Sequence, residues 1–190
     1  MIYIPIGLDC SAATFLKDKN LRLYSLPFDW TVTYSGVSDI IKDKFRSYIP
    51  MNNEKQSCNT YFVHHTFPND TEKINRRVQR FLNLLDSKTE ELIFIRKGHS
   101  QRHHEEALDR NCQIKNDLID VEELNEYLTQ NYPDLKFKII VFVFCVDCFN
   151  DEITSISKNI MIYYVKTTNV DEEYPRFLEG MTKLLSLLAK

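Results

Sequence analysis

The sequence predicts an α/β fold with a mainly parallel, open sheet and helices on both of its faces. Segments with strand character alternate with segments of helical periodicity along most of the 190 residues, and this alternation is typical of parallel sheets built from strand–helix–strand units. After Lys138, the run to Phe144 is continuously apolar rather than alternating, as expected for a central strand that is covered on both faces. We therefore predict a Rossmann-like arrangement of three layers.

The first quarter of the chain is expected to hold one strand and two helices. Apolar residues predict a strand over 2–6 and a short helix over 11–17, whereas residues 21–25 are expected to be short and extended. A second helix opens near residues 35–38 and ends before Pro50. Its apolar side chains share one face: Val37, Ile40, Ile41 and Phe45.

In the next segment, residues 51–59 are polar and are expected to form a loop, and residues 60–64 are expected to form a strand that ends in two histidines. Asp70 and Thr71 are expected to cap a third helix with their side-chain oxygens. Its apolar residues recur at helical spacing and should face the core: Ile74, Val78, Phe81, Leu82 and Leu85.

The rest of the chain is expected to contribute three further strands, over residues 91–96, 138–144 and 159–165. Asp120 and Glu123 have the spacing of a capping box and predict the start of a helix that ends before Pro133. A closing helix is predicted from Pro175, which a first turn tolerates, to Leu188.

Composition limits the function classes. With 43% hydrophobic and 27% charged residues, the chain has an ordinary globular make-up, and we expect residues 1–190 to form a single domain. The net charge of −3 offers no basic surplus for nucleic acid. No apolar stretch reaches the roughly 18 residues of a membrane span. No motif predicts a nucleotide or another cofactor.

The cysteines and the N-terminus predict a location. The chain has an odd set of cysteines without the spacing of a disulfide framework, at positions 10, 58, 112, 145 and 148. The N-terminus lacks the basic and apolar regions of a signal peptide. We therefore expect five reduced thiols in a cytoplasmic protein.

Cys10 is the leading candidate for a functional residue. It lies between the first predicted strand and the first predicted helix, just after Gly7. Free backbone N–H groups and the helix dipole at such a turn favour the thiolate, which is the nucleophilic form of cysteine. The alternative is a small buried apolar residue, because free cysteine is often fully buried.

The residues around Cys10 resemble a known family. The stretch Ile6-Gly7-Leu8-Asp9-Cys10-Ser11-Ala12-Ala13, then Leu21-Arg22, then Ser25-Leu26-Pro27-Phe28-Asp29-Trp30, is similar to the opening signature of a family described as papain-like cysteine peptidases. That family is a domain of unknown function in bacteria and some viruses, sometimes beside glycosyltransferase domains. Its second block resembles Val63-His64-His65, Arg76-Arg77 with Arg80-Phe81, and the strand that ends in Arg96.

The resemblance implies a set of roles. Cys10 would be the nucleophile, His64 or His65 its base, and Asp29 the group that orients the histidine. Trp30, Arg76, Arg77 and Arg96 would bind an unknown small-molecule, peptide or glycan substrate. The arginines of the third helix could instead form its solvated face, and Trp30 could belong to the core.

The resemblance and the sequence pattern imply different folds. A papain-like protease usually has an α+β fold, whereas the alternation here predicts an open α/β sheet. In such sheets, ligands bind beyond the carboxyl ends of the strands. Cys10, the pair His64 and His65, and Arg96 are each expected to follow a strand, so we predict that they converge on one crevice.

Details of this arrangement can be predicted further. Side chains alternate along a strand, so only one of His64 and His65 should face the site. Asp9 is a second candidate for the orienting acid, although its charge beside Cys10 would oppose thiolate formation. The predicted function is a Cys–His hydrolase or acyl transferase. The alternative is a non-catalytic binding or scaffold domain associated with glycan or polysaccharide biosynthesis.

Three further patterns are weaker. Gly7 to Ser11 loosely resembles the Gly-Asp-Ser opening of SGNH-type esterases, but the late Asp-x-x-His of those enzymes is missing. His99 and His103 could share a helical face as metal ligands, but no third ligand is evident, and we predict no metal site. Cys145 and Cys148 have redox Cys-x-x-Cys spacing without a convincing helix after them, which argues against a redox dithiol.

Overall fold

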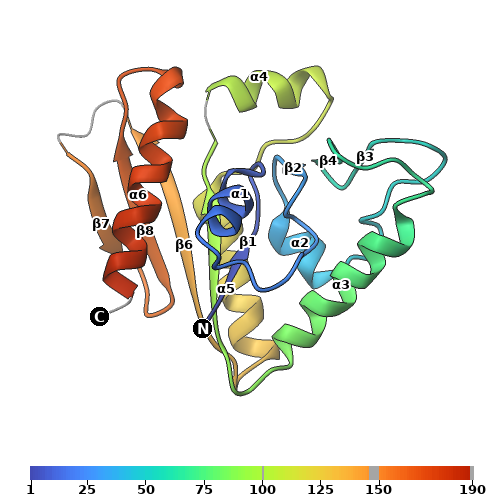
Figure 1. Ribbon diagram of the computed structural model, residues 1–190, viewed down its shortest axis with the longest axis horizontal. Helices are drawn as coiled ribbons and strands as arrows, with labels where there is room; N and C mark the ends of the chain where they lie inside the picture. Colours follow the sequence, from blue (N-terminus) through green and yellow to red (C-terminus); the bar gives the residue numbers. More distant parts are fainter. Residues whose placement is uncertain (100, 146–149, 189–190) are drawn as a thin grey trace.

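The computed structural model describes residues 1–99, 101–145 and 150–188. Its main sheet has five strands in the order β1-β5-β6-β8-β7 (Figure 1). β1, β5, β6 and β8 are parallel, and β7 pairs antiparallel with β8 at one edge. The strands are β1 Ile2–Pro5, β5 Glu91–Lys97, β6 Lys136–Cys145, β7 Glu152–Ser155 and β8 Ile160–Lys166. The predicted α/β class and its mainly parallel sheet are confirmed, and β6 is the central strand.

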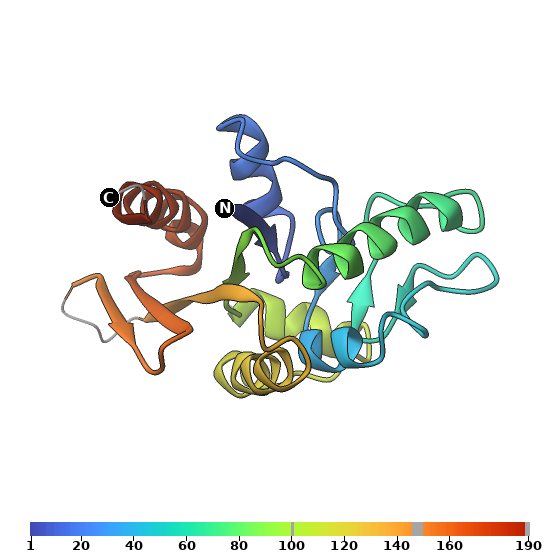
Figure 2. The ribbon, with the colours of Figure 1, turned by 90° about the horizontal axis from the view of Figure 1, so that it is seen from below.

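Helices cover both faces of this sheet, as predicted (Figure 2). α1 and α6 pack on one face, and α2, α3 and α5 contribute to the core on the other. Alternate residues of β5 enter the two cores, because Ile93 faces α1 and α6 while Phe94 faces the opposite side. The helices are α1 Ser11–Asp18, α2 Val37–Lys42, α3 Thr71–Leu85, α4 Gln101–Asp109, α5 Asp117–Asn131 and α6 Glu173–Leu188.

The strand predicted over 60–64 is wrong in length and in its sheet. Only β4, Thr60–Tyr61, is extended, and it lies in a separate three-stranded antiparallel sheet between β2, Val32–Thr33, and β3, Gln56–Ser57. β3 falls within the predicted loop. Cys58 and Asn59 link β3 to β4 with positive φ angles, a conformation typical of a tight hairpin. The two histidines therefore lie in a turn and do not end a strand of the main sheet.

Both predicted helix caps are wrong, because each acidic side chain bonds elsewhere. Asp70 precedes α3, but its carboxylate accepts from the Thr66 N–H at 2.8 Å and makes no cap bond. α5 starts earlier than predicted and is capped by Asn116. Asp120 lies inside α5 and accepts from the N–H groups of Val37 and Ser38, both at 3.0 Å. It thus satisfies the free donors at the start of α2.

A buried arginine joins the two sheets and α5. Arg96, near the end of β5, is 1% exposed. Its guanidinium donates to the carbonyl oxygens of Ile6, Thr33 and Tyr34 at 3.1, 3.0 and 3.3 Å, and to Asp117 Oδ1 at 2.8 Å. Arg96 was predicted to bind substrate, but these contacts are all within the protein.

Gly7 has two reasons to be glycine. Its φ is +87°, which L side chains rarely adopt, and a Cβ there would lie 2.5 Å from Arg96 Nη1.

Within the described parts of the chain, none of the helices combines the length and apolar character that a membrane span requires.

We expect Gly7→Ala to lower the free energy of unfolding by about 3 kcal/mol, because it adds backbone strain and displaces Arg96. Gly36→Ala is the matched control, since Gly36 also has a positive φ, +75°, but the nearest atom to its Cβ would be 3.7 Å away. Strain alone should cost the control about 1 kcal/mol. Urea denaturation measures both, and equal losses would show that contact with Arg96 is unimportant.

Candidate functional site

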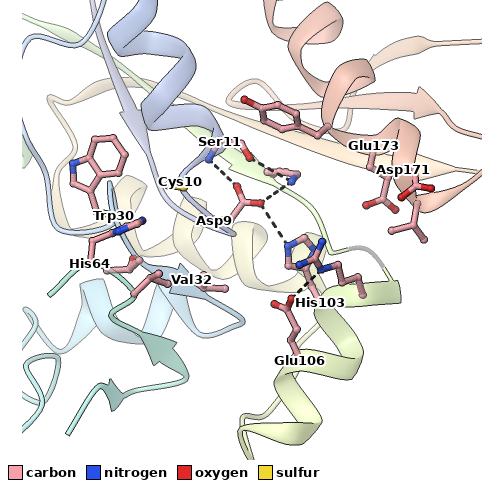
Figure 3. A pocket seen from close by; sticks show the side chains of 16 residues that line it. Asp9, Cys10, Ser11, Trp30, Val32, His64, His103, Glu106, Asp171 and Glu173 are labelled. Atoms are coloured by element: carbon pink, nitrogen blue, oxygen red, sulfur yellow. Dashed lines mark hydrogen bonds and ion pairs between the residues drawn. The ribbon is translucent and has the colours of Figure 1, made fainter.

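The candidate site is a pocket of about 460 Å³ beyond the carboxyl ends of β1 and β5. Its walls come from the turn after β1, the segment around β2, the turn after β4, α4, and the chain that enters α6. That last segment includes the short helix η1, Val170–Glu172. Figure 3 shows the residues that line this pocket. They include Asp9, Cys10, Ser11, Trp30, His64, Lys97, His103, Glu106, Glu173 and Tyr174.

Cys10 is a half-buried residue of this wall at the position just before α1. Burial raises the pKa of its thiol above the ordinary value, and the Asp9 carboxylate raises it further. Backbone hydrogen bonding and Lys97 act in the opposite direction but do not reverse the shift. Cys10 is therefore a protonated thiol at neutral pH, contrary to the thiolate that its helix position alone predicts.

Asp9 is the centre of a polar network on the pocket floor. Its carboxylate accepts from Lys97 Nζ at 2.7 Å and from the Ser11 N–H at 2.8 Å, and its Oδ2 lies 3.5 Å from His103 Nε2. Burial opposes ionisation of Asp9, but His103 and Lys97 outweigh it and hold the pKa well below the usual range. The Lys97 side chain is itself buried and lies 3.5 Å from Ser11 Oγ. Asp9 thus carries a charge that is compensated locally.

His64 lies on another wall of the pocket, packed against Trp30. Their ring centroids are 6.0 Å apart in an edge-on arrangement. The guanidinium of Arg22 lies over the Trp30 ring at 5.4 Å and donates to Asp29 at 3.2 Å. Asp29 therefore contacts Arg22, which covers Trp30, and Trp30 in turn packs against His64.

His65 belongs to a buried cluster apart from the pocket lining. Its Nε2 lies 3.5 Å from Arg77 Nη1 and its Nδ1 lies 3.6 Å from Asp70 Oδ2. Burial, then the charges of Arg77 and Lys73, lowers the pKa of His65 to about 4. Burial raises the pKa of Asp29 to about 6, although the Leu26 N–H, Arg22 and Arg77 pull it down. His65 is therefore a weak base. The Asp29 carboxylate accepts from Arg22 and from the Leu26 N–H and does not line the pocket.

The predicted site residues thus separate into groups. Cys10, Trp30 and His64 line one pocket, and only one of the two adjacent histidines does so. Asp29, His65 and Arg77 are buried and are not among the residues that line this pocket. Arg76 is exposed on α3.

Lys97 and His103 were not predicted as site residues. Lys97 immediately follows Arg96 at the end of a buried strand, and this position was a usable signal. For His103, the only signal in the sequence is its spacing from His99.

His99 and His103 do not share a helical face, because His99 lies before the start of α4 and donates to Asp117. Among the described residues, no group of three or more histidine, cysteine or acidic side chains could hold a metal ion. Cys145 ends β6 and is disulfide-bonded, which contradicts the expectation of five reduced thiols. Residues 146–148 of the Cys-x-x-Cys pattern lie outside the described residues. Cys10, Cys58 and Cys112 are free.

Asp29 and His65 should give opposite pH dependences of stability. The folded state binds the Asp29 proton more tightly than the unfolded chain does, so stability is gained as the pH falls through 6 toward 4. For His65 the folded state binds its proton less tightly, so stability is lost as the pH falls from the ordinary value through 4. Each contributes at most about 1.4 kcal/mol per pH unit.

We therefore expect Asp29→Asn to lose stability more steeply than the wild type between pH 6.5 and 4, and His65→Gln to lose it less steeply. Urea denaturation at each pH measures the slopes. Parallel curves for the three proteins would contradict the assignment.

Alkylation by iodoacetamide should report the raised pKa of Cys10. The exposed Cys58 in the same molecule is the reference thiol. Peptide mass spectrometry after a pH series should show that Cys10 requires a higher pH for labelling than Cys58 does. The Cys10→Ser variant should lose only the labelled peptide that contains position 10. Faster labelling of Cys10 than Cys58 below neutral pH would instead indicate a thiolate–imidazolium pair.

Comparison with known proteins supports the family resemblance. Residues 1–66 match the model of the family described as "Putative papain-like cysteine peptidase". No curated protein and no solved structure matches the chain significantly. The matched segment contains the Cys10 turn, Trp30 and His64, whereas Lys97 and His103 lie beyond it. The amino-terminal third of the chain, including eight of the residues that line the pocket, thus matches the model of the family described as putative papain-like cysteine peptidases.

Proposed function

We propose that the protein is a cysteine-dependent hydrolase or acyl transferase with Cys10 as its nucleophile. The observation that carries the proposal is that Cys10, at the start of α1, lines the same pocket as His64. A thiol, an imidazole and a space for substrate are the minimum that covalent acyl transfer requires. The match of residues 1–66 to a cysteine peptidase family supports the same chemistry.

In the proposed reaction, the Cys10 sulfur attacks an acyl carbonyl carbon while His64 takes the thiol proton. Because the pKa of Cys10 is raised, the proton leaves during the attack rather than before it. The carbonyl oxygen gains negative charge in this step. The ammonium group of Lys97, which lines the pocket, and the start of α1 provide positive potential for that charge.

Trp30 and Arg22 have positioning roles in this proposal. Trp30 packs against His64 and limits how its ring can turn. Arg22 covers Trp30 and is fixed by the fully buried Asp29. Asp29 therefore supports the wall that carries the base, in place of the direct bond to a histidine that the resemblance implies.

The substrate we propose is an ester, thioester or amide of a small molecule, a peptide or a glycan. The pocket mouth supports an apolar portion beside the acyl group, since Val63, Val170 and Tyr174 line it and are each at least 39% exposed. A reducing compartment such as the cytoplasm suits a free catalytic thiol, although the disulfide at Cys145 argues the other way.

A non-catalytic binding domain, for example a scaffold in glycan or polysaccharide biosynthesis, is the second candidate. The raised pKa of Cys10 favours it, because a protonated thiol next to a carboxylate is a weak nucleophile. In that case the same pocket would hold its ligand without turnover.

Acetyl transfer from p-nitrophenyl acetate distinguishes the two candidates. We expect one acetyl group on Cys10, detected by peptide mass spectrometry, and no acetylation at that position in Cys10→Ala. His64→Asn should slow the acetylation about 100-fold, as expected for loss of a general base. Cys58→Ala is the control and should react like the wild type. Absence of acetyl-Cys10 in the wild type would favour the binding domain.

A further inference from the structure

We propose that the substrate of the Cys10 pocket carries a medium-length, unbranched acyl chain, which lies in a groove between α1 and α6. This inference rests on the proposed function, because it concerns the acyl group that Cys10 would accept. It narrows the substrate class to the ester, thioester or amide of an aliphatic carboxylic acid. The small molecule, peptide or glycan is then the leaving group.

A second cavity adjoins the pocket. It has a volume of about 380 Å³ and is lined by residues of α1 and α6, and we call it the α1–α6 groove. Tyr174 lines both this groove and the Cys10 pocket, so the two cavities adjoin at its side chain. Tyr174 is 46% exposed, and exposed side chains change rotamer rapidly. Its ring can therefore turn aside to let a chain pass from one cavity into the other.

The fold leads the groove away from Cys10. α1 follows β1 and α6 follows β8, and these strands run in the same direction in the main sheet. Both helices therefore start near the carboxyl ends of the strands, where the pocket lies, and both pack on the same face of the sheet (Figure 2). Phe15 of the groove comes four residues after Ser11 of the pocket, which is about 6 Å along α1. A chain bound to Cys10 thus reaches the groove within one helical turn.

The groove has an apolar floor between polar rims. Phe15 is 6% exposed, Leu178 is partly buried, and both belong to the core on this face of the sheet. The rims consist of exposed charged or polar side chains: Asp18, Lys19, Glu179 and Thr182. A hydrocarbon chain on this floor is removed from water, which favours its binding.

An acyl chain fits this groove better than a peptide does. The groove lies between the sides of two helices, whose backbone groups are bonded within each helix and offer no partners to a peptide backbone. Two rim side chains are also engaged within α6. Thr182 Oγ1 donates to the Leu178 carbonyl oxygen at 2.9 Å, and Glu179 forms an ion pair with Arg176. A hydrocarbon chain requires none of these partners.

His64 sets the direction of the acyl group. In the proposed transfer, the bond between the Cys10 sulfur and the carbonyl carbon forms, the bond to the leaving group breaks, and the thiol proton passes through His64 to the leaving group. The leaving group therefore lies on the side of His64. Figure 3 shows His64 and Glu173 on opposite sides of Cys10. Because Tyr174 directly follows Glu173, the acyl chain extends away from His64 and toward the groove.

The chain-length dependence of Cys10 acylation tests this inference. The full-length protein reacts separately with p-nitrophenyl acetate and p-nitrophenyl octanoate, and peptide mass spectrometry measures acylation of Cys10 and Cys58. Cys58 is exposed and lines neither cavity, so it reports the intrinsic reactivity of each ester. Relative to Cys58, we expect Cys10 to prefer octanoate about 20-fold, since complete burial would give roughly fourfold for each methylene.

A pair of variants on α6 locates the chain. Leu178→Gln should lower the octanoyl preference of Cys10 about fivefold, because it places an amide in the apolar floor. Leu187→Gln is the matched control, since Leu187 is 50% exposed on the same helix and lies outside the groove. It should keep the wild-type preference. If circular dichroism shows that Leu178→Gln is unfolded, Tyr174→Gln replaces it, because Tyr174 is exposed where the two cavities adjoin.

Three results would overturn the inference. They are a wild type without octanoyl preference, equal preferences in Leu178→Gln and Leu187→Gln, and faster acylation of Cys10 by the p-nitrophenyl ester of N-acetylated dialanine than by the octanoate. The last result would identify a peptide as the occupant of the groove. If neither acetate nor octanoate acylates Cys10, the proposed function fails and this inference fails with it. If acetate acylates Cys10 and octanoate is not preferred, only the acyl-chain inference fails.

Discussion

The buried guanidinium of Arg96 is the interaction on which the rest of the structure depends. It is bonded to three carbonyl oxygens and one carboxylate, so its charge and its donors are satisfied without water. Leaving such a buried cation without its partners costs several kcal/mol. Because the partners lie at the end of β1, in and beside β2, and at the start of α5, their relative positions are fixed together. The main sheet, the small antiparallel sheet and α5 therefore form one supporting frame for the turn that carries Cys10.

Two neighbouring cations at the end of β5 serve opposite faces of the sheet. Arg96 points to the side of α5 and Asp117, whereas Lys97, one residue later, reaches Asp9 and lies 5.8 Å from the ring centre of Phe177 in α6. Alternation along a strand requires this separation. One strand end thus provides a structural cation on one face and a pocket cation on the other, and the carboxyl end of β5 becomes part of the candidate site.

The sequence predicts those parts of the fold that depend on local burial. The strands around 2–6, 91–96 and 138–144 are apolar runs that can be buried only in a sheet covered by helices. The side-chain bonds of Asp70 and Asp120 could not be predicted. Asp120 caps a helix more than 80 positions away in sequence, and local spacing carries no information about such a partner.

In the candidate site too, local motifs predict some residues, whereas contacts between distant parts of the chain decide the others. Cys10 and the pair His64 and His65 were predicted from motifs, and of these Cys10 and His64 line the pocket. Asp29 matches the motif equally well, yet its side chain is fully buried and bonded to Arg22 and Leu26. His103 is remote from both in sequence and reaches the pocket only because α4 follows β5 across its carboxyl end (Figure 1). Residue type can suggest an acid or a base, but only the fold decides which acid contacts which histidine.

Asp9 has two opposite effects on the pocket: it disfavours the Cys10 thiolate, and it holds the ammonium group of Lys97 in place. Its carboxylate raises the pKa of the adjacent thiol, which is unfavourable for an enzyme that relies on a preformed thiolate. The same carboxylate accepts a hydrogen bond from Lys97 and lies 3.5 Å from His103, so its charge also holds a cation in the pocket that Cys10 lines. In a mechanism where the thiol loses its proton only during attack, the cost of the raised pKa is partly offset, because the resulting sulfur nucleophile is intrinsically stronger. The acid beside the nucleophile is then consistent with catalysis, because the charge that raises the pKa of the thiol also holds the ammonium group of Lys97 in the pocket.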